Sequence, residues 1–237
     1  MVPAGDIIMT PRRFPNPERA DHHGLLAHSD IIDAGLVFAA HSEGIFPWYD
    51  SGDPVLWWSP DPRAIIPTDA VHISHSLRKL LRTMPYHLTL DIAFSRVIDY
   101  CANVHGESWI TADIRRCYTE LYRQGRVHSC ELWHGDTLIG GMYGVGLERI
   151  FCGESMFSLR PSASKIVLVR LCQYLARIGI DTLDTQFLTP HLVSMGAIHI
   201  PRRDYLARLS DNPDAHRGRW QVQGGRRGRL PRRVRLL

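Results

Sequence analysis

The chain has 237 residues, a formal net charge of +4 and 44% hydrophobic residues. This apolar content is ordinary for a folded protein, and no apolar run reaches the roughly eighteen residues that a membrane-spanning helix needs. Proline and charge interrupt the N-terminal segment before an apolar stretch forms, which argues against a secretory signal. We therefore expect a cytoplasmic protein without a membrane partner.

The cysteines and histidines show no metal-binding spacing. The chain has five cysteines, an odd number, and no C-x-x-C motif, a pattern typical of free thiols in a reducing compartment. The histidines are scattered, with no H-x-x-x-H or H-E-x-x-H motif beside cysteine pairs. We therefore predict no metal site.

The N-terminal part of the chain, residues 1–61, predicts a small domain. The first 25 or so residues look extended, and residues 30–44 read as a short amphipathic helix that Gly44 ends. A stretch rich in tryptophan and proline follows, with little helical periodicity. A domain boundary fits between Pro60 and Pro62.

This stretch contains two adjacent tryptophans, Trp57 and Trp58. Adjacent residues of a strand point to opposite faces, so the two side chains cannot fill the same core. We expect one of them in the core and the other at the interface between the small domain and the larger one.

Residues 62–208 predict an α+β domain, in which helices flank a mixed sheet. Residues 128–158 read as an antiparallel meander. A helix over 162–179 and a buried strand over 181–188 then predict a parallel crossover. The predicted segments before the meander are strands at 63–67 and 86–92 and helices at 72–84, 93–104 and 111–125.

The C-terminal residues 209–237 are rich in arginine, and no acidic residue occurs from Gly224 on. Such a composition is typical of a disordered tail that polyanions attract. Two interpretations stay open: a solvated tail without a dedicated role, and a nonspecific contact with nucleic acid that salt would weaken.

Nine sequence blocks occur in a specific order between about residue 25 and residue 206. They are "GIFPW", "LWWSPDPRA", "HISHSLRK", "ESWIT", "GGMYG", "FCGESMFS", "ASKI", "TQFLTPHLVSMGA" and "IPRRDYL". Together they resemble the leucyl/phenylalanyl-tRNA–protein transferase family. The resemblance implies a small N-terminal domain on a larger acetyltransferase-like domain.

The resemblance also implies an enzyme. Members of the family move Leu or Phe from aminoacyl-tRNA to proteins whose first residue is Arg or Lys, which marks those proteins for N-end rule degradation. The expected partners are therefore aminoacyl-tRNA, with Met as a further candidate donor, and such proteins or peptides. An aminoacyl ester is already activated, and an α-amine with a pKa of about 7.7–8.0 attacks it without a strong base, so we expect no cofactor.

Three polar residues are candidates for catalysis. Asp184 and Gln186 lie two apart on a predicted strand, so their side chains would share a face and could orient an amine or stabilise developing charge. Glu154 follows a glycine of the meander, where backbone can approach a ligand closely. Spacing alone also fits a polar strand rim, whereas the resemblance implies that all three positions belong to the active site.

Apolar residues beside the meander glycines are candidates for an amino-acid pocket. Met142, Phe151 and Met156 also fit an ordinary core, whereas the resemblance implies that they bind the Leu or Phe side chain. It adds Trp48, which could stack on the terminal adenine of the tRNA, and Trp109.

The predicted helix over residues 72–84 carries Arg78, Lys79 and Arg82. Arg78 and Arg82 share a helix face because they are four residues apart. A solvated basic face is the simple interpretation. The resemblance implies contact with the tRNA backbone, which positions the tRNA without reading its sequence.

Two other functions and one other catalytic mechanism are alternatives to this prediction. Acyl transfer from coenzyme A would favour a glycine-rich loop before the helix at 162–179, and the loop "SLRPSASK" has no glycine. A thiol nucleophile would use Cys152 with His191, although free cysteine is more often a small buried residue. An RNA-binding module would use the basic tail, and it leaves the polar residues of the predicted strands unexplained.

Overall fold

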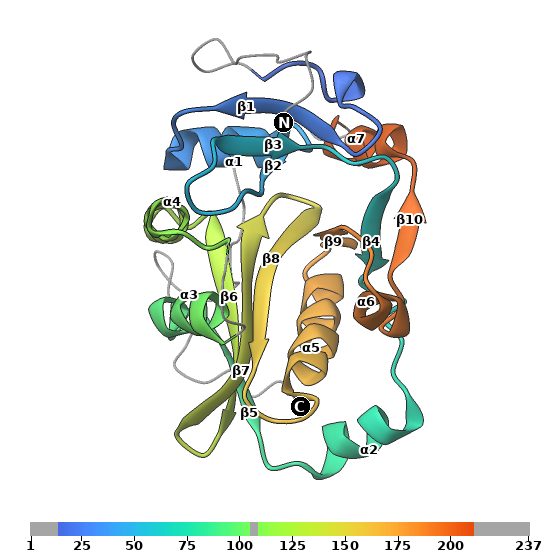
Figure 1. Cartoon of the computed structure of the whole chain (residues 1–237). Helices are drawn as coiled ribbons and strands as arrows, with labels where there is room; N and C mark the ends of the chain where they lie inside the picture. The colour runs from blue at the N-terminus through green and yellow to red at the C-terminus, as the bar shows by residue number, and fades with distance from the viewer. Residues whose placement is uncertain (1–13, 105–108, 211–237) are drawn as a thin grey trace.

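The computed structural model describes residues 14–104 and 109–210. The predicted tail from residue 209 lies outside them, apart from its first two residues. The described chain forms a three-stranded sheet of order β1-β3-β2 and a seven-stranded sheet of order β10-β4-β9-β8-β7-β6-β5. Figure 1 shows the small sheet lying across one end of the larger one.

The small domain is built around one helix and three short strands. After a 3-10 turn at Pro17–Arg19 come β1 (Leu25–Ser29), α1 (Ala34–Ser42), β2 (Phe46–Pro47) and β3 (Val55–Trp58). The predicted helix is confirmed, although it begins only after Asp33, whose side chain accepts a hydrogen bond from the Leu36 amide. The sequence did not predict β1, because its pairing with β3 is a tertiary contact.

Gly44 ends α1 as predicted, and two observations favour glycine there. Its φ of +79° lies in the left-handed region. A Cβ atom at this position would also lie 2.5 Å from the Leu206 side chain. The chain therefore turns tightly here against a helix from the opposite end of the sequence.

The two tryptophans divide as predicted. Trp57 is fully buried in the small domain and donates a 2.9 Å hydrogen bond to the Ser29 hydroxyl. Trp58 is partly exposed, and its ring centroid lies 6.3 Å from that of Phe187, which belongs to the larger domain. Trp57 is thus the core residue and Trp58 the interface residue.

The larger sheet contains the predicted meander and crossover. The antiparallel strands β6, β7 and β8 are followed by α5, and β9 then pairs parallel to β8. The expected α+β fold with a mixed sheet is therefore confirmed. The elements of this domain are, in chain order, β4 (Arg63–Pro67), α2 (His75–Thr83), β5 (His87–Leu90), α3 (Phe94–Asn103), α4 (Ala112–Arg123), β6 (Val127–His134), β7 (Thr137–Gly146), β8 (Ile150–Ser158), α5 (Ala163–Arg177) and β9 (Thr182–Gln186). Three further elements were not predicted: α6 (Pro190–Ser194), β10 (Ile198–Ile200) and α7 (Arg202–Ser210).

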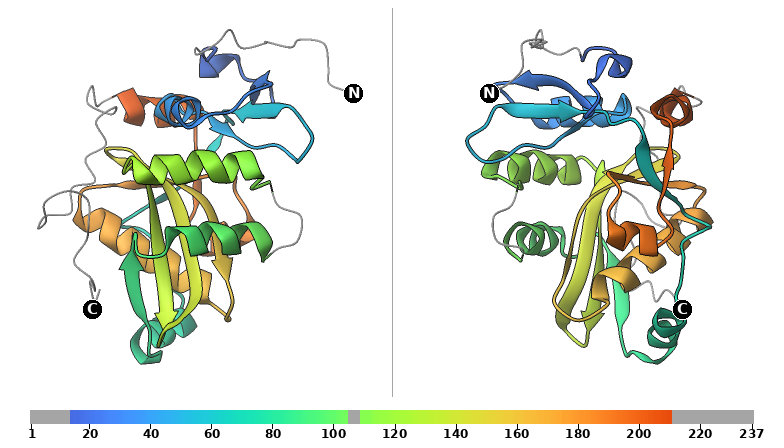
Figure 2. Two further views of the ribbon diagram at one scale, coloured as in Figure 1. Left: turned by 90° about the vertical axis from the view of Figure 1, so that its left-hand side faces the viewer. Right: turned by 45° about the vertical axis from the view of Figure 1, so that its right-hand side comes forward.

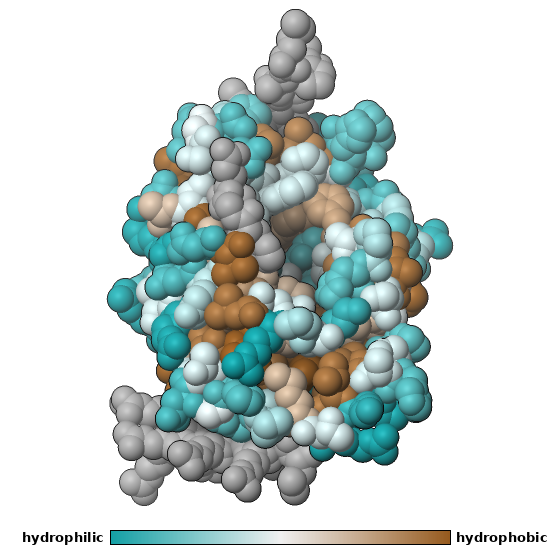
Figure 3. Space-filling view, turned by 60° about the horizontal axis from the view of Figure 1, so that its bottom comes forward, coloured by the Kyte–Doolittle hydropathy of each residue, from teal (hydrophilic) through white to brown (hydrophobic). Residues whose placement is uncertain are grey.

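Helices cover both faces of the larger sheet. Figure 2 shows α3 and α4 lying side by side across one face, and α5 covers the other. α5 packs with α2 over one apolar cluster. Seen from the end that carries α2, the surface mixes hydrophilic and hydrophobic residues, and the latter gather in patches (Figure 3).

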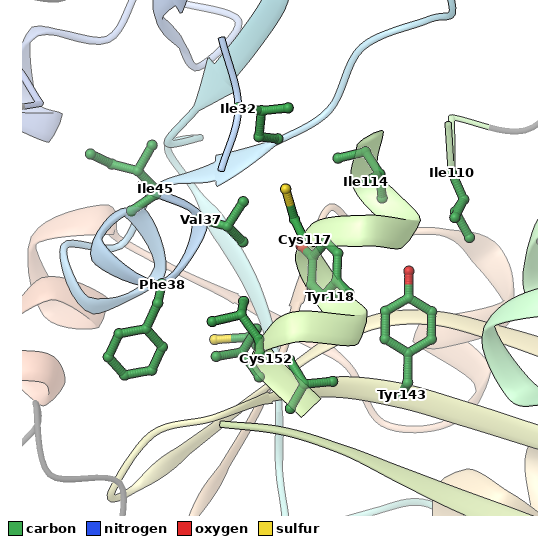
Figure 4. Packing of buried hydrophobic residues seen from close by; sticks show 14 of the residues in the cluster. Ile32, Val37, Phe38, Ile45, Ile110, Ile114, Cys117, Tyr118, Tyr143 and Cys152 are labelled. Atoms are coloured by element: carbon green, nitrogen blue, oxygen red, sulfur yellow. The ribbon is translucent and has the colours of Figure 1, made fainter. Parts of the chain in front are cut away.

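The cluster under α3 and α4 continues into the small domain. Figure 4 shows Ile32 and Val37 of the small domain facing Ile114 and Cys117 of α4. The two parts of the chain therefore share one hydrophobic core across the predicted boundary near residue 61, and neither buries its apolar face alone.

The described ranges contain no helix that is long and apolar enough to cross a membrane. They also bring together no group of three or more His, Cys, Asp or Glu side chains that could hold a metal ion.

The shared core predicts that the protein unfolds in one cooperative step. Replacing the fully buried Ile114 with alanine removes apolar contacts on both sides of the boundary and should cost about 2–5 kcal/mol. Urea unfolding followed by tryptophan fluorescence and by circular dichroism measures this loss. The two signals should shift together.

The control is Ile31→Ala, because Ile31 is 63% exposed. It should change stability by no more than about 0.5 kcal/mol. Two separate transitions in the Ile114→Ala variant would show that the two domains fold independently.

Candidate active site

The end of β9 carries a fully buried carboxylate, Asp184. Arg63, on the neighbouring strand β4, donates from Nε to Oδ1 at 2.9 Å and from Nη2 to Oδ2 at 2.7 Å. The Tyr205 hydroxyl donates to Oδ2 at 2.8 Å, and the Gln186 amide nitrogen donates to Oδ1 at 3.0 Å. Each carboxylate oxygen of Asp184 therefore accepts two hydrogen bonds from the protein itself.

These contacts keep Asp184 ionised. Burial by itself raises the pKa of this carboxyl, but the charge and hydrogen bonds of Arg63 outweigh it and hold the pKa below the ordinary value. A carboxylate with a depressed pKa and occupied lone pairs is a weak base. The geometry thus favours electrostatic support over proton abstraction for this residue.

Arg63 joins three parts of the chain. Its guanidinium lies between the rings of Phe46 and Tyr205, 4.7 and 4.5 Å from their centroids. It also donates to the Gly44 carbonyl oxygen at 3.1 Å. This role was not predicted from the sequence, although Arg63 begins the apolar strand "RAIIP", and a buried guanidinium needs a charged partner.

Gln186 departs from the extended strand that the shared-face prediction assumes. Its φ is +56°, a left-handed conformation that is uncommon for residues other than glycine. Its backbone amide meets Asp184, while its side-chain Nε2 lies 3.5 Å from Glu154 Oε1. The structure therefore brings all three predicted catalytic residues together, with Gln186 between the two carboxyl groups.

Glu154 lies on β8 and is nearly fully buried, with 2% side-chain exposure. The Tyr118 hydroxyl donates to its Oε2 at 2.5 Å, and His41 Nε2 lies 3.4 Å from its Oε1. Burial raises the pKa of Glu154 to about 8 and lowers the pKa of His41 to about 3. His41 is therefore neutral, and the Glu154 carboxyl titrates near physiological pH.

His41 and Tyr118 were also not predicted as site residues. They come from α1 and α4, which are distant in sequence from β8, and only the shared core brings them together. Tyr118 carries a helical apolar pattern that predicts burial but no polar partner. A histidine in the otherwise apolar α1 is the one signal that could have been used.

The five predicted pocket residues are divided between three places. Met142, Phe151 and Met156 belong to the cluster on the α5 side of the sheet. Trp109 packs against the opposite cluster, under α3 and α4. Trp48 is 45% exposed at the domain interface.

An aromatic group surrounds Trp48 next to Gln186. The ring centroid of Phe187 lies 5.4 Å from that of Trp48 and 5.7 Å from that of Phe46. Trp58 completes the group, 6.0 Å from Trp48. Phe187 was not among the sequence candidates because its partners lie in the other domain.

The basic residues of α2 lie away from this site. Arg78, Lys79 and Arg82 are exposed, and α2 lies at the end of the molecule opposite the small sheet (Figure 1). The side chain of Ser74 caps the helix by accepting from the Leu77 amide, and the buried Leu77 anchors it on the α5 side. The three cations therefore form a separate basic surface.

The environment of Cys152 does not suit a thiol nucleophile. Cys152 is fully buried, and this burial raises its pKa well above the ordinary value, so the thiol stays protonated. Its Sγ lies 3.8 Å from the Tyr205 hydroxyl, and within the described residues it makes no hydrogen bond with His191. The structure favours a structural role for this cysteine.

Family models match most of the chain. The model of the leucyl/phenylalanyl-tRNA protein transferase covers residues 65–210, and the model of its N-terminal domain covers residues 30–61.

One relative and two solved structures place the chain further. A leucyl/phenylalanyl-tRNA–protein transferase of Salmonella paratyphi A is 46% identical over 200 residues, which are 83% of this chain and 86% of that protein. A conserved protein of unknown function from Staphylococcus epidermidis superposes with a TM-score of 0.41 at 12% identity, over 75% of this chain and 68% of that one. L-PGS from Bacillus licheniformis superposes with a TM-score of 0.37 at 13% identity, over 69% and 54%. These two likenesses are too remote to carry an argument, whereas the family models and the relative show that the chain belongs to the leucyl/phenylalanyl-tRNA protein transferase family.

Proposed function

We propose that this aminoacyltransferase moves leucine or phenylalanine from aminoacyl-tRNA to proteins whose first residue is arginine or lysine. The observation that carries the acceptor half of the proposal is Glu154, a buried carboxyl beside Gln186 that titrates near neutral pH. An incoming cation favours the ionised form of such a group and is in turn held by it. The proposed place of the reaction is the cytoplasm, where charged tRNA is made, and the transferred acyl group would mark the acceptor for degradation.

The chemistry asks mainly for positioning. The acceptor α-amine attacks the ester carbonyl, a C–N bond forms, the C–O bond to the tRNA ribose breaks, and the ribose oxygen receives the proton. Correct orientation alone can contribute about 7–11 kcal/mol to such a reaction. In the proposal, the side-chain amide of Gln186 donates a hydrogen bond to the ester carbonyl oxygen as negative charge develops on that oxygen. Glu154 binds the cationic first residue of the acceptor.

Asp184 acts through its neighbours in this proposal. Its hydrogen bond from the Gln186 amide nitrogen supports the left-handed backbone that turns the Gln186 side chain toward Glu154. Its ion pair with Arg63 supports the junction of the two domains. We therefore assign it electrostatic support rather than proton transfer.

For the donor we retain Met142, Phe151 and Met156 as the pocket residues, with Met as a further candidate donor. Met142 and Phe151 are buried in the cluster on the α5 side of the sheet, so a Leu or Phe side chain would have to displace part of this packing. Trp48 would stack on the terminal adenine. Trp109 is retained as a pocket residue, although it packs against the cluster on the other face of the sheet. The tRNA backbone would contact Arg78, Lys79 and Arg82, which are exposed on α2.

The decisive experiment uses phenylalanyl-tRNA and a peptide that begins with arginine. The mass of the peptide should increase by one Phe residue. An acetylated peptide should gain nothing, because its nitrogen is no longer nucleophilic. The Glu154→Gln variant should lose about 10- to 100-fold in kcat/KM for the peptide, since a hydrogen bond to a charged group is worth about 1.5–3 kcal/mol.

The matched control for this experiment is Glu120→Gln, since Glu120 is a partly exposed carboxylate of α4 away from the site. It should transfer at the wild-type rate. If none of the Leu, Phe or Met donors is transferred although tRNA binds, the proposal is wrong and an RNA-binding protein is the better interpretation.

Asp184→Asn should destabilise the protein by about 3–5 kcal/mol, because it leaves the buried Arg63 without its counter-ion. The depressed pKa of Asp184 adds stability that is present above the unfolded pKa and disappears as the pH falls through the folded pKa. The difference in the free energy of unfolding between wild type and variant should therefore be largest near neutral pH. It should decrease below the ordinary Asp pKa of about 3.9. Urea unfolding at several pH values measures it.

Asp181→Asn is the matched control, since Asp181 pairs with Arg149 at the surface. It should cost no more than about 1 kcal/mol. An Asp184→Asn variant as stable as this control at neutral pH would contradict the role given to the buried pair.

Arg78→Ala should weaken binding of aminoacyl-tRNA without changing the acceptor KM. Each phosphate contact that is lost should reduce the slope of log affinity against log salt by about 0.7–0.9. Binding at several salt concentrations measures the slope. Arg123→Ala on α4 removes an exposed charge from another surface and should leave the slope unchanged, and equal slopes for both variants would remove α2 from the tRNA contact.

A further inference from the structure

His41 carries a fully buried imidazole from the small domain to the polar side chains of the larger sheet. It lies on α1, and its side chain has 0% exposure. Its Nε2 atom lies 3.3 Å from the Tyr118 hydroxyl oxygen and 3.4 Å from Glu154 Oε1. The proposed transfer reaction does not by itself require a histidine there.

When Glu154 is ionised, its short contact with Tyr118 fixes the direction of the neighbouring hydrogen bond. A tyrosine hydroxyl has one proton, and the 2.5 Å bond to the Glu154 carboxylate uses it. Toward His41 the hydroxyl oxygen can then only accept. The donor of the 3.3 Å contact is therefore the Nε2–H of a neutral imidazole.

The other ring nitrogen supports the same tautomer. His41 Nδ1 is buried and has no hydrogen-bond partner among the described residues. A buried N–H without a partner is rarer in proteins than a buried acceptor without one, so the proton is better placed on Nε2. With the proton on Nε2, the three side chains form a chain of hydrogen bonds from His41 through Tyr118 to Glu154.

We propose that His41 is a positioning residue that donates a hydrogen bond to Tyr118. This bond keeps the Tyr118 hydroxyl donating to Glu154 and so favours the ionised carboxylate that binds the cationic N-terminal residue of the acceptor. The proposal rests on the proposed transferase function. Hydrogen bonds in a chain polarise one another, so the donor at the far end strengthens the bond at the carboxylate. Removing it should make the ionised form of Glu154 harder to reach.

Other groups facing Glu154 also act on its ionisation. Asp184 of β9 disfavours the charged form, and Arg63 of β4 favours it. Two buried groups that stay protonated, Cys152 of β8 and Tyr143 of β7, also lie near Glu154. His41 itself has a pKa of about 3, so it stays neutral in the working range and does not add a titration of its own.

The first test compares His41→Leu with His41→Gln over a range of pH. Leucine removes the donor and keeps an apolar volume, whereas the glutamine amide can still donate to Tyr118. We expect His41→Leu to lose about tenfold in kcat/KM for an arginine peptide at pH 7 and clearly less at pH 9, with the KM for aminoacyl-tRNA unchanged. His41→Gln should recover most of the loss.

The acceptor amine titrates in the same way with every variant, so the ratio of variant to wild type reports the enzyme alone. A loss that is equal at all pH values, or equal in both variants, would show that His41 is only structural and would overturn the proposal. So would the absence of any loss. Circular dichroism establishes that each variant is folded.

The second test reads the tautomer directly and does not depend on activity. In the whole chain with ¹⁵N-labelled histidine at about pH 9, where Glu154 is ionised, NMR should find the His41 proton on Nε2, and Tyr118→Phe should shift the His41 signal. A proton on Nδ1 would overturn the proposed direction of the hydrogen bonds. If wild-type protein transfers no amino acid with any donor, the proposed function fails, while this measurement still decides the direction.

Discussion

The buried ion pair of Arg63 and Asp184 is the constraint on which the rest of the structure depends. Two charges without exposure are costly to take out of water, and only close pairing and full hydrogen bonding offset that cost. Here the guanidinium reaches the small domain at Gly44 and packs on Tyr205 of α7, while the carboxylate reaches the backbone of Gln186. The pair thus links β4 with β9, the larger domain with the small one, and both with the backbone of Gln186.

The shared core gives this pair its setting. Because α1 packs on α4, His41 and Tyr118 meet at Glu154, which neither domain could arrange alone. The site is consequently a product of domain packing. Its two carboxyl groups differ because of their partners: Asp184 faces a permanent cation, whereas Glu154 faces a neutral imidazole and a hydroxyl group.

Local pattern carried the prediction of most of the fold. The meander and the crossover helix follow from periodicity and turn residues, which neighbouring positions determine. β1, β10 and α7 escaped because their pairing and packing partners are distant in sequence. The same reason hid Arg202, which donates to the Ser59 carbonyl oxygen at the predicted domain boundary.

The three predicted catalytic residues are brought together by the structure, but their contacts could not be predicted. Asp184, Gln186 and Glu154 came from spacing together with family resemblance, and they do lie together. The prediction from spacing assumed an extended strand. It therefore gave neither the left-handed backbone at Gln186 nor the ion pair of Asp184 with Arg63. Tertiary electrostatics of this kind leaves little trace in a single sequence.

The packing of α7 beneath the small domain has a consequence for synthesis on the ribosome. Tyr205 reaches Asp184, and Leu206 abuts Gly44, so residues near position 205 complete a site whose first members lie near position 41. A nascent chain that still lacks α7 already contains Glu154, Asp184 and Gln186. Its Arg63 guanidinium would pack on Phe46 but not on Tyr205. The contacts of the site are therefore complete only after α7 has been synthesised.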